Sequence, residues 1–404
     1  MEKERLLSLG AGVVCLARAA LHKTPIQKEE LLRMDLCGIQ KMAGYHSMDA
    51  IVYLSLKEAA EASDGEILEK IDTNVYKKLE NAYRNSVRRL IAFDCEREQI
   101  LSFFKEKGAW YLCLKGIVLQ EYYPKLGMRQ MADNDILFDK KYAAALRSFM
   151  QSRGYKTLSY GKGCHDMYGK GDLIFELHRS LLPEKKSNAG IIAALREILE
   201  QTARGASSLE RRFSKENFYI YFILHTHKHF EIAGCGLRSL MDIYVYTKKH
   251  ESDLDFAYID AFFSHIGLSD FEKRLRSLAN RLFEKNDESA DAMLSSLSKD
   301  ERALLLFLSG SGTFGTEQTH MKNDLLRLSK NEDITARAKF KYLLERVFPP
   351  FSYYKAAHPR LYKWIVPIPF LWALRLLGAI SKRARISREL ENLRNAGETD
   401  KNKE

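Results

Sequence analysis

Cysteine is scarce in this 404-residue sequence, and no two cysteines form a C-x-x-C pair. Structural zinc sites and disulfide frameworks usually depend on paired or regularly spaced cysteines. Their absence therefore argues against both kinds of site and indicates a reducing, cytoplasmic compartment. The six scattered residues are Cys15, Cys37, Cys95, Cys113, Cys164 and Cys235.

Proline is absent from residues 26–107, and no internal repeat is visible at the periods of solenoid proteins. Apolar residues recur there at three- and four-residue spacings, as at Ile67, Ile71 and Val75, which predicts helices. Glu2 and Glu4 precede an apolar run at residues 9–20, unlike the basic start of a secretory signal. We therefore predict a helical N-terminal region that begins with an ordinary helix.

The net charge of +11 favours a polyanionic partner, which could be a nucleic acid, a membrane surface or a nucleoside triphosphate. The basic residues form no recognisable nucleic-acid-binding element, so we rank that partner lowest. Residues 364–380 are apolar but contain Pro367, Pro369 and Arg375, and they are shorter than a comfortable span of about 20 residues. We expect a buried or interfacial segment, with peripheral membrane contact through the basic residues that follow it.

The middle of the chain changes to the pattern of strands. Short apolar or alternating runs predict strands at residues 110–114, 132–138, 155–158, 166–168 and 172–178, with helices at 117–123 and 141–152. After Pro183 the pattern is helical again, most clearly at residues 213–230 and 237–248. The predicted fold is α+β, a small mixed β-sheet flanked by helical regions. Its predicted parts are residues 1–107, 108–183, 184–380 and a charged tail at 381–404.

A D-x-D motif stands on the second predicted strand. Side chains alternate along a strand, so Asp133 and Asp135 would point the same way and could share Mg²⁺, which prefers oxygen ligands. A chain of this length contains about one such pair by chance. A second pair, Asp253 and Asp255, lacks a preceding strand and glycine turn, and we interpret it as a helix cap or turn. The order of elements before Asp133 distinguishes the first pair.

That order resembles the uncharacterised nucleotidyltransferases of the polymerase-β-like superfamily. The resemblance depends on Leu114-Lys115-Gly116, Tyr123-Pro124, Arg129 and Asp133-Asn134-Asp135-Ile136-Leu137. A later Glu176-Leu177-His178 strand and the more distant His229, Arg238 and Asp242 are similar to further family elements. The sequence departs from the superfamily at Gly116, which lacks the usual small neighbour, and at Asn134, which replaces an apolar residue.

The resemblance implies transfer of a nucleoside monophosphate from an NTP to an acceptor hydroxyl by metal-ion catalysis. Asp133 and Asp135 would hold Mg²⁺ or Mn²⁺, and Glu176 would complete the metal site or take the proton. The remaining predicted contacts to substrate are Lys115, Gly116, Arg129, His178 and His229, of which Lys115 and Arg129 would neutralise phosphate charge. The acceptor could be a small molecule, a saccharide or a protein. The alternative is an inactive binding or scaffold protein, which could sit at a membrane surface.

Two further pairs have ordinary interpretations. His225 and His229 lie four residues apart on a predicted helix, and we interpret them as lining a cleft more readily than as zinc ligands. Arg238 and Asp242 have the same spacing and predict an ion pair within one helix.

Overall fold

The computed structural model describes residues 2–182, 189–204, 208–313, 317–329 and 335–348, together with Trp372 and Leu393. The chain divides into two compact units, one of Met1–His227 with Cys235–Thr313 and one of Lys228–Gly234 with Phe314–Glu404. The predicted apolar segment 364–380 and charged tail 381–404 lie outside the described residues, apart from Trp372 and Leu393.

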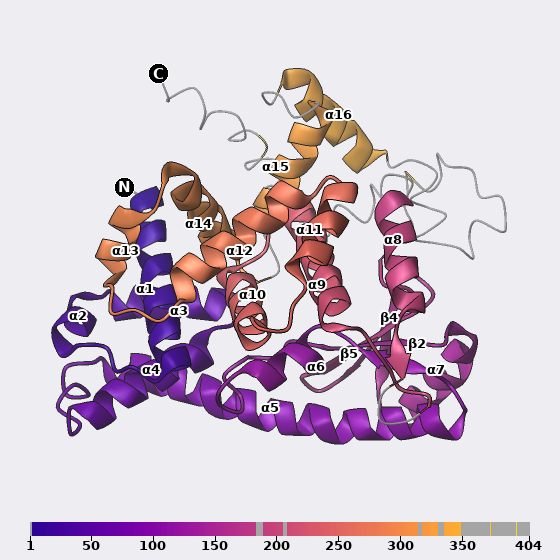
Figure 1. Ribbon diagram of the computed structural model, residues 1–404, viewed down its shortest axis with the longest axis horizontal. Helices are drawn as coiled ribbons and strands as arrows, with labels where there is room; N and C mark the ends of the chain where they lie inside the picture. The colour runs from indigo at the N-terminus through magenta and orange to yellow at the C-terminus, as the bar shows by residue number, and fades with distance from the viewer. Residues whose placement is uncertain are drawn as a thin grey trace. The chain divides into compact units, whose positions relative to one another are not determined.

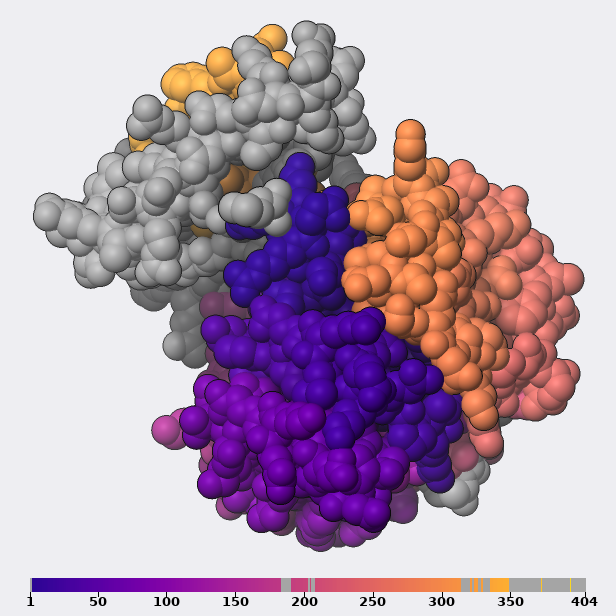
Figure 2. Space-filling model, turned by 90° about the vertical axis from the view of Figure 1, so that its left-hand side faces the viewer, coloured from indigo at the N-terminus to yellow at the C-terminus, as the bar shows by residue number. Residues whose placement is uncertain are grey.

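The N-terminal region is helical, as predicted. Its helices are α1 (Glu2–His22), α2 (Lys28–Arg33), α3 (Leu36–Tyr45), α4 (Asp49–Ala62) and α5 (Thr73–Glu106). Among the described residues α1 alone is long and apolar enough to cross a membrane, but 72% of its most apolar stretch is buried inside the fold. It packs against α3, α4 and three later helices, α12 (Ser269–Phe283), α13 (Ala290–Ser296) and α14 (Lys299–Ser311). The N-terminal residues adjoin that later segment in Figure 2. These contacts identify α1 as a core helix of the first unit.

Five strands form one mixed sheet, which confirms the predicted α+β fold. They are β1 (Tyr111–Cys113), β2 (Asn134–Phe138), β3 (Lys156–Ser159), β4 (His165–Lys170) and β5 (Leu173–His178). The strand order is β1-β2-β5-β4-β3, in which β2 and β5 are parallel and the other neighbours antiparallel. Helix α6 (Gly116–Leu119) and a short 3₁₀ turn (Gln120–Tyr122) follow β1, and α7 (Ala143–Ser152) follows β2.

One face of this sheet is covered and apolar. Ile136, Phe138, Phe175 and Leu177 pack there against α5 and α7, in a core cluster that includes Phe93. Helix α5 runs along this side of the sheet in Figure 1. Because side chains alternate along a strand, the polar residues at positions 135, 176 and 178 point to the opposite face. The hydrophobic core thus orients the carboxylates.

The prediction of helices after Pro183 is wrong at one place. A two-stranded ribbon, β6 (Ala203–Arg204) with β7 (Arg211–Arg212), separates α8 (Ala189–Glu200) from the next helix. Tyr111 donates its backbone N–H to the Leu209 carbonyl at 3.0 Å. The ribbon therefore brings the chain back to the edge strand β1 and pairs backbone groups that would otherwise be exposed. Such a long-range contact leaves no local pattern in the sequence.

The other predicted helices are present. The first unit continues with α9 (Lys215–Ile232, whose end belongs to the second unit), α10 (Leu237–Lys249), α11 (Phe256–His265), α12 (Ser269–Phe283), α13 (Ala290–Ser296) and α14 (Lys299–Ser311). The second unit contains α15 (Glu317–Leu328) and α16 (Ala336–Val347). Asp255 caps α11 by accepting the Tyr258 N–H at 3.0 Å, which confirms the interpretation of the second D-x-D pair. The boundaries of the four predicted parts stay predictions.

Candidate functional site

The register of β2 and β5 brings the predicted acidic residues together. Asp135 lies opposite Glu176, and Leu137 lies opposite His178, in the parallel ladder. Neighbouring strands are about 4.8 Å apart, so side chains at paired positions on one face are in contact range. Asp133 stands one residue before β2 begins, at the entrance to the same face. The predicted strand at residues 132–138 is present, but β2 begins two residues later than predicted and leaves Asp133 just outside the ladder.

Asp135 is the most strongly held of these carboxylates. Lys115 donates to Asp135 Oδ1 from Nζ at 2.5 Å, and His178 Nε2 lies 2.7 Å from the same oxygen. The Asp135 side chain is only 2% exposed. Burial alone would raise its pKa, but Lys115 and His178 outweigh burial and hold the pKa of Asp135 well below its usual range. Asp135 is ionised at any physiological pH.

Lys115 reaches this position from a strained backbone. Its φ of +44° lies in the left-handed region, which residues with a side chain rarely adopt. The Lys115 Nζ also lies 3.9 Å from Glu176 Oε2, so one ammonium group bridges two carboxylates. Strain of this kind is concentrated at functional sites, where surrounding contacts maintain it. The structure brings the predicted Lys115 to the site, although its predicted contact with phosphate stays a prediction.

Gly116 follows Lys115 and is glycine for a steric reason. A Cβ atom at this position would lie 2.7 Å from Arg129 Nη1 and 2.8 Å from Met131 Cε. A larger residue would have to displace the ends of these two buried side chains. Close packing thus accounts for this glycine, and its predicted contact with substrate stays a prediction.

Asp133 has the least compensated charge in the site. It is half-buried and forms no ion pair with any residue that the structure describes. Burial and the negative charges of Asp135 and Glu176 raise the pKa of Asp133 to about 6, against the opposing effects of Lys115 and Arg238. The same excess of negative charge that favours a proton on Asp133 would also favour a cation beside it. The oxygen-rich surroundings fit a divalent metal such as Mg²⁺.

Glu176 and His178 complete the set on β5. His178 Nε2 lies 3.6 Å from Glu176 Oε2, and His165 Nε2 lies 3.7 Å from Glu176 Oε1. Burial opposes the charged form of His178, but Asp135, Cys164 and Glu176 beside it raise its pKa to about 10. Ligand atoms of Asp135, Glu176 and His178 all lie within 4.8 Å of one another, which is close enough for one metal ion. Asp133 is not a member of that group of three.

Arg129 is committed to a different carboxylate. Its Nε and Nη2 donate to the two carboxylate oxygens of Asp242 at 2.7 and 2.9 Å, and the Tyr123 hydroxyl donates to Asp242 Oδ1 at 2.7 Å. This buried contact ties the loop before β2 to α10. The predicted role of Arg129 in neutralising phosphate is not tested, but its charge is already balanced by Asp242.

Asp242 therefore pairs with Arg129, and the predicted ion pair with Arg238 is replaced. Arg238 donates from Nη1 to the Gln130 carbonyl at 2.8 Å and contacts no described carboxylate within ion-pair distance. Burial and the nearby Arg129 lower the pKa of Arg238. The charge of Arg238 acts on Asp133 and lowers its pKa. Arg238 is thus a cation near the carboxylates. The i, i+4 spacing did not predict this position, because it assigned Arg238 to an ion pair with Asp242.

Three further residues near the carboxylates were missed at the level of sequence. The Tyr221 hydroxyl on α9 is buried, has no hydrogen-bond partner in the described chain and interacts electrostatically with Lys115 and Asp135. Cys164 and His165 meet where β4 begins, with Sγ 3.5 Å from Nδ1. Burial opposes ionisation of Cys164, but the imidazoles of His165 and His178 lower the pKa of its thiol to about 6. The one sequence signal for His165 is strand alternation. His165 stands two residues before Met167, which pairs with Glu176, so the two residues share a face of β4.

The histidines of α9 have separate places. His225 belongs to the first unit and His229 to the segment Lys228–Gly234 of the second, so the predicted contact of His229 with substrate stays a prediction. Neither residue is a member of a potential metal-ligand group among the described residues. The interpretation that they line a cleft stays a prediction.

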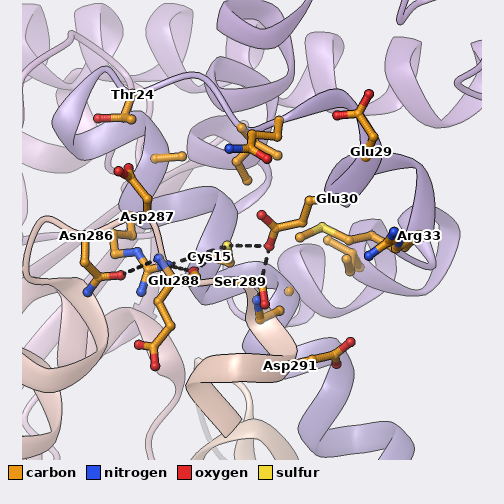
Figure 3. A pocket seen from close by; sticks show the side chains of 18 of the residues that line it. Cys15, Thr24, Glu29, Glu30, Arg33, Asn286, Asp287, Glu288, Ser289 and Asp291 are labelled. Carbon is orange, nitrogen blue, oxygen red and sulfur yellow. Dashed lines mark hydrogen bonds between the residues drawn. The ribbon is translucent and has the colours of Figure 1, made fainter. Parts of the chain in front are cut away.

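A pocket of about 570 Å³ lies elsewhere in the first unit, between α1, α2 and residues 286–291 (Figure 3). Acidic side chains outnumber basic ones in its lining, and Glu30 accepts from the Cys15 thiol at 3.5 Å and from the Ala290 N–H at 3.1 Å. None of the predicted site residues lines this pocket. It is therefore separate from the carboxylates of β2 and β5.

Comparison with known proteins agrees with this geometry. The model of a family described as uncharacterised nucleotidyltransferase matches residues 35–284, which is more than half of the chain and includes the whole five-stranded sheet. No curated protein and no solved structure matches the chain.

Proposed function

The chain belongs to this uncharacterised nucleotidyltransferase family, and from that premise we propose that it transfers a nucleoside monophosphate from an NTP to an acceptor hydroxyl, with Mg²⁺ or Mn²⁺. The observation that carries the proposal is the convergence of Asp135 and Glu176, in register on parallel strands, with the poorly compensated Asp133. Oxygen ligands gathered on one face are what a metal–triphosphate complex requires.

In this mechanism Asp133 and Asp135 would hold the metal, and Glu176 would accept the proton of the acceptor hydroxyl or complete the metal site. Bound metal would neutralise triphosphate charge and lower the pKa of the acceptor hydroxyl. His178 keeps Asp135 in place through the 2.7 Å contact of Nε2. Because Asp135 is already charged and oriented, its side chain does not need to rearrange when the reaction begins.

Two cationic side chains are candidates for binding the phosphates. Lys115 bridges Asp135 and Glu176, and a metal ion that balanced those two carboxylates would leave Lys115 available to neutralise phosphate charge. Arg238 has no carboxylate partner in the described chain and is the better candidate for a triphosphate contact than Arg129, whose partner is Asp242. The six unbridged cysteines support a reducing, cytoplasmic setting as part of the proposal.

The test is nucleotide binding by the full chain. Isothermal titration with each NTP is expected to show saturable binding in Mg²⁺ or Mn²⁺ that EDTA abolishes. Labelled NTPs incubated with small-molecule, saccharide and protein acceptors should then reveal base and acceptor. If no NTP binds in either metal, the transferase proposal fails and the inactive scaffold replaces it. Liposome flotation at low salt would then measure whether this scaffold protein binds a membrane surface.

Activity is expected to fall as the pH drops through about 6. The pKa of Asp133 is raised to about 6, so below that pH its carboxyl is protonated and loses its affinity for metal. The measurement is kcat/KM against pH, which reports groups of the free enzyme. Arg238→Ala removes a charge that lowers this pKa and should shift the acid limb to higher pH.

Lys215→Ala is the matched control for that shift. Lys215 is also a cation beside a D-x-D pair, where its Nζ lies 2.6 Å from Asp253. Removing it should leave the acid limb unchanged. An acid limb that stays in place in Arg238→Ala would contradict the role assigned to Asp133.

A further inference from the structure

A thiol and two imidazoles meet beside the carboxylates, at the end of the sheet where β4 begins and β5 ends. His165 and His178 lie opposite each other in the antiparallel ladder, and their ring centroids are 5.0 Å apart. Cys164 precedes His165 and is buried. One ligand atom from each of the three residues lies within 4.8 Å of the others. These positions are set by the same register that pairs Met167 with Glu176.

The ring nitrogens of the two histidines are divided between two sets of partners. Each Nε2 faces a carboxylate: that of His178 is 2.7 Å from Asp135 Oδ1, and that of His165 is 3.7 Å from Glu176 Oε1. The Nδ1 of His165 lies 3.5 Å from the Cys164 sulfur. The Nδ1 of His178 is buried and has no hydrogen-bond partner of ordinary geometry within the described chain, and the Cys164 thiol lies beside this ring. His178 is only 2% exposed, so bulk solvent does not reach this nitrogen.

This division is the one that metal-binding histidines use. A histidine that ligates a metal through one nitrogen almost always donates the N–H of the other to a carboxylate or carbonyl group, which fixes the ring. His178 already has the carboxylate on Nε2 and leaves Nδ1 without a hydrogen-bond partner of ordinary geometry. The orphaned buried nitrogen is therefore explained if a cation occupies the space between it, His165 and Cys164.

We propose that Cys164, His165 and His178 form a second metal site, selective for a transition metal such as Zn²⁺ and distinct from the carboxylate site. Thiolate and imidazole ligands suit Zn²⁺, whereas Mg²⁺ prefers oxygen. Three protein ligands leave a fourth position for water or substrate. On binding, the thiol proton and any proton on the ligating nitrogens are released to solvent.

The proposed site would be connected to the catalytic face through His178. A metal on Nδ1 fixes the proton of this ring on Nε2, where it is donated to Asp135. His178 would then act as a positioning residue for Asp135 as well as a ligand. The absence of a C-x-x-C motif does not bear on such a site, because a single cysteine suffices when strand pairing supplies the histidines.

The experiment uses Co²⁺, which replaces Zn²⁺ and gives thiolate sites a sulfur-to-metal charge-transfer absorption. Full-length protein stripped with chelator is titrated with Co²⁺ and then with Zn²⁺, without any nucleotide. We expect one equivalent of Co²⁺ to produce the charge-transfer band, Zn²⁺ to remove it and excess Mg²⁺ to leave it. Cys164→Ser should abolish the band and weaken Zn²⁺ binding, measured by chelator competition, at least about tenfold.

Two matched variants separate this site from its neighbours. Cys113→Ser changes a cysteine of the same sheet whose side chain packs on the opposite, α5-facing side, and it should retain the band. Asp133→Asn removes a carboxylate of the nucleotide site and should also retain the band. His165→Gln provides a second ligand variant if Cys164→Ser does not fold, as judged by near-ultraviolet circular dichroism.

The proposal is overturned if the unmodified protein shows no charge-transfer band with Co²⁺, or if Mg²⁺ displaces the Co²⁺. A band that persists in both Cys164→Ser and His165→Gln would also overturn it. Because no nucleotide is present, these results are independent of nucleotidyl transfer. Loss of NTP binding would leave the metal site intact, and loss of the metal site would leave the transferase proposal intact.

Discussion

Asp133→Asn is expected to reduce metal-dependent nucleotidyl transfer by a factor on the order of 10² to 10³. Asparagine matches aspartate in size but carries no charge, so the variant resembles the protonated state that Asp133 adopts below a pH of about 6. A neutral amide holds a divalent cation far more weakly than a carboxylate does. The measurement is the rate of transfer from labelled NTP, together with the metal dependence of NTP binding.

Asp133 is a cleaner target than Asp135. Asp135 balances Lys115 and His178 in a buried site, so its removal would leave two cations without a partner and would confuse loss of function with loss of stability. Asp133 forms no ion pair with a described residue, and its removal relieves repulsion with Asp135 and Glu176. Asp133→Asn should therefore fold normally, with an unchanged or slightly higher midpoint of unfolding.

The second D-x-D pair provides the control. Asp253→Asn alters the same motif at an exposed position, where Asp253 contacts Lys215 outside the sheet. Transfer and NTP binding should match those of the unmodified protein. If Asp133→Asn keeps transfer within a few-fold of the unmodified rate, Asp133 does not hold the metal and the proposed site is wrong.

Arg129→Met is expected to lower the free energy of unfolding by about 3 to 5 kcal/mol, because it leaves the buried Asp242 without its cation. Both carboxylate oxygens of Asp242 accept from Arg129, and the Arg129 and Asp242 side chains are only 8% and 4% exposed. Tyr123 would remain as the partner of Asp242 at 2.7 Å. The measurement is equilibrium unfolding in urea, compared at constant m-value.

Two comparisons sharpen that result. Arg84→Met removes an exposed arginine that pairs with Glu80 four residues away, and it should cost about 0.5 kcal/mol or less. Combining Arg129→Met with Asp242→Leu replaces both charges by apolar groups and should recover part of the lost stability. If Arg129→Met lowers the free energy of unfolding by less than about 1 kcal/mol, the ion pair of Arg129 with Asp242 does not stabilise the fold as proposed. Arg129 would then again be a candidate for phosphate contact.

Sequence patterns predicted much of the fold because those patterns are local. The patterns of residues 132–138 and 172–178 predicted strands, which the structure has at Asn134–Phe138 and Leu173–His178, and three- and four-residue spacing predicted the helices on either side. The order of lysine–glycine turn, helix and D-x-D strand was enough to indicate the family. Each of these signals arises within about 20 residues, where backbone geometry alone decides which side chains share a face.

The tertiary structure decided which residues contact the site carboxylates and Asp242. Asp135 faces Glu176 because β2 and β5 are parallel neighbours, although some 40 residues separate them. Asp242 binds Arg129 and not the nearer Arg238, since the loop before β2 buries a guanidinium against α10. Cys164 and His165 adjoin His178 through the antiparallel register of β4. The sequence by itself thus determined the strand at which the D-x-D pair lies. Long-range packing decided which cations, histidines and thiol surround the pair. The sequence could not show these partners, because pairing across a sheet leaves no periodic trace along the chain.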